Sequence, residues 1–307
     1  MRIGRASAVT DTGRRRLQNE DAFVCDPPLF AVADGMGGAQ AGELASRLAA
    51  TALEGRPPGL HGEDAVAGLL HDANERIHRH ALDDPAVAGM GTTVTALLVD
   101  EAAGTITIGH VGDSRAYRVR DGRLEQLTAD HSLVAELVRT GRLTPEEAEQ
   151  HPHRSVITRA LGTEPDVEVD TLTVEASPGD LYLLCSDGLT AMVRDQEIVE
   201  LVEHADADPD ACADALVEAA NRAGGEDNIT VVLFEIVEGA PQPEQPHEPA
   251  AAAEPDEITT EHVALAEGDP AGVRRHGAGS GGRWLALAAV LTTLGAAVLV
   301  IWWSLGR

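Results

Sequence analysis

Short apolar runs that end at an aspartate constrain this chain more than any other feature of its sequence. Residues 30–33 (FAVA) are followed directly by Asp34, and residues 181–185 (LYLLC) are followed one position later by Asp187. Apolar runs of this length that stop at glycine-rich turns are typical of strands buried in a core. The chain therefore places carboxylates at the ends of buried strands, where a charge needs a structural or chemical reason.

The order of the predicted elements indicates the fold class. Strand-like runs occur at positions 30–33, 93–99, 105–111, 116–119, 181–185 and 229–236. Helical patterns lie between the strand clusters: residues 64–82 with one apolar face, a capping box from Thr144 to Glu147, a helix capped by Asp195, and residues 211–222. Because strict βαβα alternation is absent, the pattern favours an α+β fold with antiparallel sheets over a doubly wound fold.

The charge balance excludes several classes of function. The chain has 51 acids against 23 bases and a formal net charge of −28. This balance disfavours nucleic acid as a partner, because binding requires Lys and Arg to neutralise phosphates. All of the bases are Arg, so chemistry that needs Lys, such as P-loop nucleotide binding or a Schiff base, is excluded.

Three widely spaced cysteines, Cys25, Cys185 and Cys212, fit neither a disulfide framework nor a zinc site. Cys25 and Cys185 adjoin apolar runs, so buried thiols are expected. The first ten residues lack the apolar core of a signal peptide. Both observations predict a cytosolic location for the folded part of the chain.

Composition divides the chain into three zones. Residues 1–238 have the apolar patterns of a folded domain. Residues 239–283 are rich in Pro, Ala and Glu and are predicted to be a disordered, extended linker. Residues 284–303 carry no charge and would span about 30 Å as a helix, so a transmembrane helix is predicted, with a buried core helix as the alternative.

The arginines around this last segment predict its orientation. Arg274, Arg275 and Arg283 precede it, and only Arg307 follows. The positive-inside rule therefore predicts a single-pass protein of the cell membrane, whose folded domain is cytoplasmic.

Five aspartates stand at the margins of the predicted strands: Asp21, Asp34, Asp113, Asp187 and Asp227. Any one of them alone is better explained as a turn residue. Five together favour a shared site, because unpaired carboxylates crowded at the end of a domain repel one another and a divalent cation removes that repulsion. Oxygen ligands without His or Cys predict Mg²⁺ or Mn²⁺, and Gly35 would let its carbonyl approach the metal.

Seven motifs occur in order within residues 1–236: TDTGRRRLQNED, VADGMGG, GMGTTVTALL, GHVGDSRAY, LTADHS, SDGL and EDNITVV. Together they resemble the metal-dependent protein serine/threonine phosphatases of the PP2C (PPM) family, in its bacterial branch. The resemblance implies a four-layer α-β-β-α sandwich, in which two antiparallel sheets are flanked by helices and a metal centre lies at one end.

The resemblance also implies roles for the acids. Asp34 matches the carboxylate that bridges two metals, and the Gly35 carbonyl matches a further ligand. Asp187 and Asp227 match the remaining ligands of the first metal. Glu20 and Asp21 match the acidic pair at the second metal, and Asp113 matches the acid that holds a third metal in bacterial members.

Three further positions carry expectations from the same resemblance. Arg16 matches the arginine that grips the substrate phosphate, and a guanidinium fork suits phosphate oxygens, although a solvated basic run is the alternative. Residues 128–162 look like the flap that borders the site, where His131 is a candidate for a direct role. Some members have a histidine that protonates the leaving group at the position of Met36, so the proton donor stays open here, with a metal-bound water as the candidate.

The function that follows is hydrolysis of phosphoserine and phosphothreonine in proteins by water activated at a centre of two or three Mn²⁺ or Mg²⁺ ions. The expected partners are phosphorylated proteins, among them membrane-associated Ser/Thr kinases and their substrates. Two alternatives are a catalytically weak module that binds phosphoproteins and a membrane scaffold. Neither the physiological substrates nor the oligomeric state is indicated by the sequence.

Overall fold

The fold is described from a computed structural model in which residues 1–239 are placed. The predicted linker over residues 239–283, apart from its first residue, and the predicted transmembrane helix over residues 284–303 lie outside the described residues. Among the helices within residues 1–239, none is long and apolar enough to cross a membrane.

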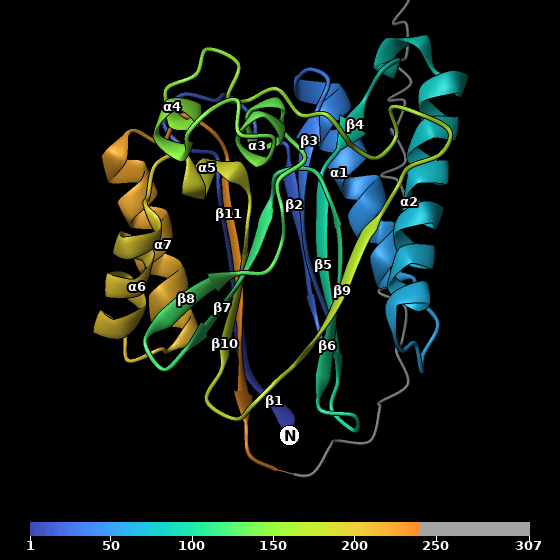
Figure 1. The fold of residues 1–307 in the computed structure, drawn as a ribbon. Coiled ribbons are helices and arrows are strands. Elements are labelled where there is room, and N and C mark those ends of the chain that lie inside the picture. The colour runs from blue at the N-terminus through green and yellow to red at the C-terminus, as the bar shows by residue number, and fades with distance from the viewer. Residues whose placement is uncertain (240–307) are drawn as a thin grey trace, which may run out of the picture. The chain divides into compact units, whose positions relative to one another are not determined.

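Two antiparallel sheets form the centre of the fold (Figure 1). The first has the order β1-β11-β10-β7-β8, formed by Arg2–Asp11, Ile229–Val237, Leu181–Cys185, Arg115–Arg120 and Arg123–Gln126. The second has the order β2-β3-β5-β6-β9, formed by Asp21–Asp26, Leu29–Met36, Val94–Asp100, Thr105–Val111 and Asp170–Glu175, and the short β4 (Gly91–Thr92) pairs with β3. The predicted antiparallel α+β fold is therefore confirmed for the described residues.

Helices cover the outer face of each sheet, which makes four layers (Figure 1). On the second sheet lie α1 (Ala39–Glu54) and α2 (Glu63–Asp83), and on the first lie α6 (Asp195–His204) and α7 (Pro209–Ala223). Three short helices, α3 (Leu133–Arg139), α4 (Pro145–Glu149) and α5 (Asp187–Thr190), lie at the upper end in Figure 1, and a 3₁₀ turn, η1, spans Pro85–Val87.

Small aliphatic side chains build the two outer interfaces, and the few aromatic residues concentrate between the sheets. Phe30 of β3 stacks on Phe234 of β11 with ring centroids 4.0 Å apart, and Tyr182 of β10 stacks on the other side of Phe234 at 5.2 Å. All three side chains are fully buried. This stack joins the two sheets and fixes the direction in which their strand ends point.

The structure agrees with most of the predicted elements. All six predicted strands are present, and α4 has both hydrogen bonds of the capping box between Thr144 and Glu147. The prediction that Asp195 caps a helix is wrong: Asp195 is the first residue of α6, and the cap position is Arg194, which makes no side-chain cap bond. The negative charge of Asp195 still lies in the first turn of α6, where it interacts favourably with the helix dipole.

The cysteines behave as the sequence suggests. All three are free, with Cys185 and Cys212 buried and Cys25 half-buried. Cys185 lies at the end of β10 in the cluster beneath α6 and α7. Burial raises the pKa of the Cys185 thiol to about 12, so this sulfur is a packing group and not a nucleophile.

Candidate metal centre

Asp34 is the third residue from the end of β3, and both its N–H and its carbonyl are hydrogen-bonded. Its N–H donates to Thr93 Oγ1 at 3.1 Å, and its carbonyl accepts from the Thr93 N–H at 2.9 Å and from Thr92 Oγ1 at 2.8 Å. With the main chain held in this way, the side chain at the strand end is directed into the protein. The buried residues of β3 before Asp34 thus hold the main chain that carries this carboxylate in place.

Asp21 lies directly opposite Asp34 in the β2–β3 pairing. Its Oδ2 accepts hydrogen bonds from Ser186 Oγ at 2.8 Å and from Thr230 Oγ1 at 2.7 Å. Its Oδ1 is buried and has no hydrogen-bond partner. An unpartnered buried carboxylate oxygen is costly, so it indicates a position where a further positive group fits.

Asp113 occupies the turn between β6 and β7 and repeats this pattern, because its Oδ1 is also buried without a partner. Gly112 precedes it with a φ of +116°, a conformation that L side chains rarely adopt. A Cβ on Gly112 would lie 2.4 Å from the Thr93 Cβ. The turn therefore packs closely against Thr93, the residue that also hydrogen-bonds the main chain of Asp34.

Asp187 and Asp227 come from the first sheet. Asp187 begins α5 immediately after β10, and Asp227 precedes β11 by one residue. Asp227 Oδ2 accepts from Arg16 Nη2 at 2.6 Å, and its Oδ1 accepts from the Asn228 N–H at 2.8 Å. Arg16 is therefore placed beside the carboxylates and is not part of a freely solvated basic run.

Burial, reinforced by mutual repulsion, raises the pKa values in this group. Burial raises the pKa of Asp34 well above its ordinary value, and the charges of the other four aspartates raise it further. Burial and neighbouring acids likewise raise the pKa of Asp21 and of Asp113 to about 7, and that of Asp187 to about 6. The five aspartates therefore lie within electrostatic reach of one another, which the strand-end pattern predicted.

Glu20 is buried at the margin of the group, and burial raises its pKa whereas the charge of Arg16 lowers it. Glycines make this packing possible. A Cβ on Gly35 would lie 2.1 Å from the Gly42 carbonyl oxygen, and a Cβ on Gly42 would lie 2.0 Å from Glu20 Oε2. Neither position has room for a side chain, so the backbone of Gly35 lies close to Glu20 and to the adjoining Asp34.

These donors fit hard divalent cations. The group offers only oxygen atoms, two of them buried and unpartnered, and its excess of negative charge is what an ion would neutralise. Within residues 1–239, no three His, Cys, Asp or Glu side chains lie close enough to hold an ion alone. Mg²⁺ and Mn²⁺ commonly keep several waters, so such a site does not need a closed set of side chains.

Asn228 is a site residue that the sequence interpretation did not single out. Its Oδ1 accepts from the Glu20 N–H at 2.8 Å, and its Nδ2 donates to the carbonyls of Thr12 at 3.0 Å and Gln18 at 2.9 Å. It thereby ties the loop that carries Arg16 to the strand that follows Asp227. The only sequence signal was its position beside Asp227, because nothing in a single sequence distinguishes a buried Asn from a turn Asn.

His131 lies apart from the carboxylates, among backbone groups and the flap. Its Nδ1 accepts from the Gly112 N–H at 3.0 Å, and its Nε2 lies 3.2 Å from Asp170 Oδ2. Its backbone carbonyl accepts from the Thr158 N–H at 2.8 Å. None of these hydrogen bonds joins His131 to one of the five aspartates.

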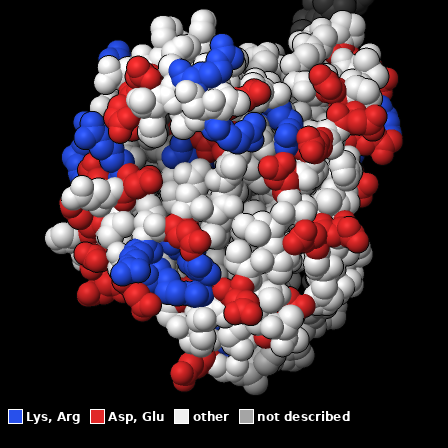
Figure 2. Space-filling view, viewed as in Figure 1, with Lys and Arg blue, Asp and Glu red and all other residues white. Residues whose placement is uncertain are grey.

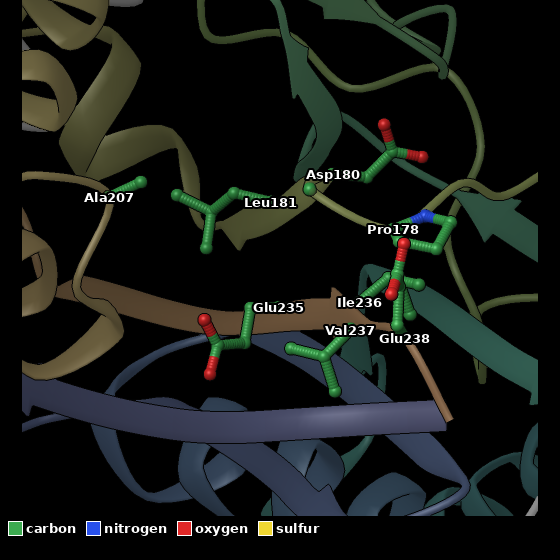
Figure 3. Close-up of a pocket in the computed structure, with 9 residues that line it drawn as sticks. Pro178, Asp180, Leu181, Ala207, Glu235, Ile236, Val237 and Glu238 are labelled. Carbon is green, nitrogen blue, oxygen red and sulfur yellow. The ribbon is translucent and has the colours of Figure 1, made fainter. Parts of the chain in front are cut away.

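A pocket of about 380 Å³ lies at the opposite end of β11 from Asp227 (Figure 3). Its lining includes Asp180, Leu181, Glu235 and Glu238. Arg120 pairs with Asp180 through two hydrogen bonds, and Arg5 pairs with Glu235, so two of these acids already have partners. None of the five clustered aspartates lines this pocket, which therefore belongs to a separate part of the molecule.

Charged side chains gather in groups on the face shown in Figure 2. Basic side chains form a cluster at the lower left, and acidic side chains gather toward the right-hand side.

The sequence profile of the protein phosphatase 2C family matches residues 12–223. The chain belongs to the protein phosphatase 2C family.

Named relatives within the protein phosphatase 2C family cover the described part of the chain. The Mycobacterium tuberculosis protein named serine/threonine protein phosphatase PstP is 44% identical over 239 residues, which are 76% of this chain and 45% of that protein. The chain thus matches about half the length of this relative. A Listeria monocytogenes serine/threonine phosphatase, stp, is 42% identical over 238 residues, which are 74% of this chain and 93% of that protein.

Solved structures of the family agree with the fold. The crystal structure of M. tuberculosis PstP superposes with a TM-score of 0.72 at 41% identity and covers 77% of this chain and 100% of that chain. The catalytic domain of PstP in complex with two manganese ions superposes with a TM-score of 0.70 at 40% identity, over 77% of this chain and 99% of that chain. A protein phosphatase 2C fold that holds two Mn²⁺ ions is therefore observed in a similar protein.

Proposed function

We propose that this chain is a metal-dependent protein serine/threonine phosphatase. The observation that carries the proposal is the group of five aspartates at the strand ends, with Arg16 at its margin. Burial and neighbouring acids raise the pKa values of four of them, Asp21, Asp34, Asp113 and Asp187. Such a group is unfavourable by itself and becomes favourable when it holds divalent cations. The names and the bound manganese of its relatives support the same activity.

Six acids and one backbone carbonyl would hold the ions. In this assignment Asp34 would be shared by two Mn²⁺ or Mg²⁺ ions, with the Gly35 carbonyl as a further ligand. Asp187 and Asp227 would complete the first site, and Glu20 and Asp21 would serve the second. Asp113 would hold a third ion. When bound, such ions lower the pKa of water and neutralise charge on the phosphoryl group.

Arg16 would bind the substrate phosphate. Its side chain is 48% exposed, so it is accessible, and it hydrogen-bonds Asp227 through Nη2. The remaining guanidinium N–H groups would offer a bidentate donor pair to two phosphate oxygens. Asp227 fixes one side of the guanidinium, so the fork is oriented before the substrate arrives.

Met36 supplies no proton to the leaving group. It follows Gly35 at the end of β3, and a thioether has no proton to give. We assign the protonation of the leaving serine or threonine oxygen to no side chain, and a water bound at the cation site is the candidate donor. The buried Ser114 and Ser186 are hydrogen-bonded to Thr93 and Asp21, and we assign neither as a nucleophile.

The proposal extends to the organisation of the whole chain. Residues 1–238 would be the phosphatase domain, residues 239–283 a linker, and residues 284–303 a transmembrane helix that places the domain at the cytoplasmic face of the membrane. The uncharged twenty-residue segment and the arginines before it support this arrangement. The substrates would then be phosphorylated proteins near that membrane, including Ser/Thr kinases and their targets.

The test uses the purified 307-residue chain in detergent with a phosphothreonine peptide as substrate. We expect hydrolysis with Mn²⁺, none with EDTA, and recovery when Mn²⁺ is restored. A chain that binds the peptide tightly but releases no phosphate would instead support a phosphoprotein-binding module. A chain that does neither would support a scaffold.

A further inference from the structure

His131 makes two hydrogen bonds with a single residue, Gly112. Its backbone N–H donates to the Gly112 carbonyl at 2.7 Å, and its Nδ1 accepts from the Gly112 N–H at 3.0 Å. Gly112 is the residue before Asp113, in the turn that joins β6 to β7. The imidazole and the main chain of His131 therefore together hold Gly112, the residue before a buried carboxylate.

The Nδ1 contact fixes the tautomer of His131. Because Nδ1 accepts a hydrogen bond from a backbone N–H, the ring proton lies on Nε2. Nε2 is 3.2 Å from Asp170 Oδ2 and 3.1 Å from Arg159 Nη1. Two donors cannot bond to each other, so the partner of Nε2–H is Asp170, whose Oδ1 also accepts from Arg159 Nη1 at 2.5 Å.

His131 belongs to the flap, residues 128–162, and its main chain also bonds to the far end of this segment. The Thr158 N–H donates to the His131 carbonyl at 2.8 Å, and Ser132 forms a β-bridge with Ile157. Arg159 lies one residue beyond Thr158 and pairs with Asp170, the residue to which His131 donates. His131 itself is only 8% exposed, whereas the side chain of its partner Asp170 is 49% exposed.

The turn that carries Asp113 transmits any displacement of Gly112. Gly112 packs against Thr93, because a Cβ added at Gly112 would lie only 2.4 Å from the Thr93 Cβ. The turn therefore has no space to move toward Thr93. Asp113 Oδ1 has no hydrogen-bond partner of its own. The direction of the carboxylate therefore depends on the backbone that His131 holds.

We propose that His131 is a positioning residue that links the flap to Asp113: its Nδ1 and N–H hold Gly112, and its Nε2–H and carbonyl hold Asp170 and Thr158. This inference rests on the proposed function, because Asp113 is there a ligand of the third cation. It assigns His131 a role in cation affinity and not in contact with the substrate.

The test measures Mn²⁺ binding to the full chain by electron paramagnetic resonance, without substrate, alongside the Mn²⁺ dependence of peptide hydrolysis. In His131→Ala we expect the weakest class of bound Mn²⁺ to lose about 10-fold in affinity, since changes behind a ligand typically cost 10–100-fold. The tighter classes and the KM for the peptide at saturating Mn²⁺ should stay within about 2-fold.

Two further variants separate positioning from a general structural effect. His131→Asn should recover most of the lost affinity, because an Asn Oδ1 can accept from the Gly112 N–H. Asp170→Ala removes the exposed acceptor of Nε2–H and should weaken the same class of Mn²⁺ by a smaller factor, even if His131→Ala fails to fold. His78→Ala is the matched control: His78 bonds the Gly162 carbonyl at the end of the flap, makes no contact with Gly112, and should bind Mn²⁺ as the unchanged chain does.

Equal Mn²⁺ affinity in all classes for His131→Ala would overturn the proposal, and so would an equal loss for His131→Ala and His131→Asn in every class. Failure of the proposed function is distinguishable from both. In that case the unchanged chain binds Mn²⁺ but does not hydrolyse the peptide, and the order of Mn²⁺ affinities among the variants still decides the role of His131.

Discussion

Asp34 carries a charge in a place that disfavours it. The residue is buried, and four other aspartates raise its pKa further. Replacing this carboxylate by a neutral amide of the same shape removes repulsion from the fold and at the same time removes the group proposed to bridge two ions. Stability and activity are therefore expected to move in opposite directions at this position.

In Asp34→Asn we expect the rate of phosphopeptide hydrolysis to fall by more than about 100-fold, since even changes behind a metal ligand cost 10–100-fold. The thermal midpoint in EDTA at pH 7.5 should rise above that of the unchanged chain. Both are measured on the same preparation, by phosphate release and by calorimetry. Full activity in this variant would contradict the proposed metal centre.

A buried aspartate at the other end of the molecule provides the control. Asp180 is 1% exposed, and both of its oxygens accept hydrogen bonds from Arg120 at 2.5 Å. Asp180→Asn should lower the free energy of unfolding by about 2–3 kcal/mol, because it weakens charge-assisted hydrogen bonds and leaves Arg120 without its counter-ion. A urea titration in EDTA should thus shift in opposite directions for the two Asp→Asn changes.

Arg16 offers a test of phosphate binding that leaves the charge in place. Lys at this position keeps a positive group near Asp227 but loses the planar fork. We expect Arg16→Lys to raise the KM for a phosphothreonine peptide by about 10–100-fold, the size of one or two lost charge-assisted hydrogen bonds. The adjacent Arg15→Lys is the matched control, since Arg15 is exposed and only its backbone N–H bonds Gly225. An unchanged KM for Arg16→Lys would remove Arg16 from the substrate site.

At the scale of elements, the contact between the two sheets keeps the strand ends aligned. Phe234 stands between Phe30 and Tyr182 and is fully buried. Phe234→Ala should lower the free energy of unfolding by about 3–5 kcal/mol, the usual cost of truncating a buried Phe. Leu82→Ala is the comparison, because Leu82 is 72% exposed on α2 and should change stability by less than about 0.5 kcal/mol. Denaturant titrations of the two variants decide the matter, and similar midpoints would mean that the stack does not carry the sheet contact.

The elements differ in how far they can be predicted from sequence. Strands buried on both faces, such as β3 and β10, appear as unbroken apolar runs and are predicted correctly. Strand β1 (Arg2–Asp11) is largely half-buried and its sequence RIGRASAVTD mixes charged and small residues, so no period stands out. Helix α1 was not predicted, although it is as amphipathic as α7. Six of its 16 residues are Ala, which favours a helix but is small and only weakly apolar.

Only part of the site can be predicted from a single sequence: the strand-end acids can be recognised, but their convergence cannot. A strand end followed by Asp is a local pattern, so Asp34 and Asp187 are recognisable in a single sequence. Their convergence is not local, because it depends on the pairing of β2 with β3 and of β10 with β11. The hydroxyls of Ser186 and Thr230 on Asp21 and the amide of Asn228 arise only after those pairings form, which is why sequence reasoning missed them.

For the molecule as a whole, the raised pKa values predict how stability depends on pH. Asp21, Asp113 and Asp187 titrate at about 7, 7 and 6 in the folded chain, against 3.8 for an ordinary Asp. Between these values the folded state binds more protons than the unfolded chain, so this contribution to stability is present at low pH and is lost as pH rises through about 6 to 7. The direction is opposite to that of a carboxylate in a salt bridge.

In EDTA we therefore expect the thermal midpoint to fall between pH 5 and pH 8. Millimolar Mn²⁺ should raise the midpoint by several degrees at pH 8 and by much less at pH 5, where protons compete for the same carboxylates. Differential scanning calorimetry in both conditions provides the measurement. A midpoint that stays level or climbs over this range in EDTA would show that these aspartates are not crowded in solution.

The pairing of β1 with β11 places Arg2 opposite Val237, so the two ends of the folded part are neighbours on adjacent strands. A short peptide could join them, and the chain could be opened instead at Asp121–Gly122, the tight turn between β7 and β8. Such a circular permutant should still hydrolyse the phosphopeptide, which an activity assay can check. Asp187 and Asp227 would then be synthesised before Asp21, Asp34 and Asp113. Their meeting point would not change, because neighbouring strands bring them together irrespective of which is made first.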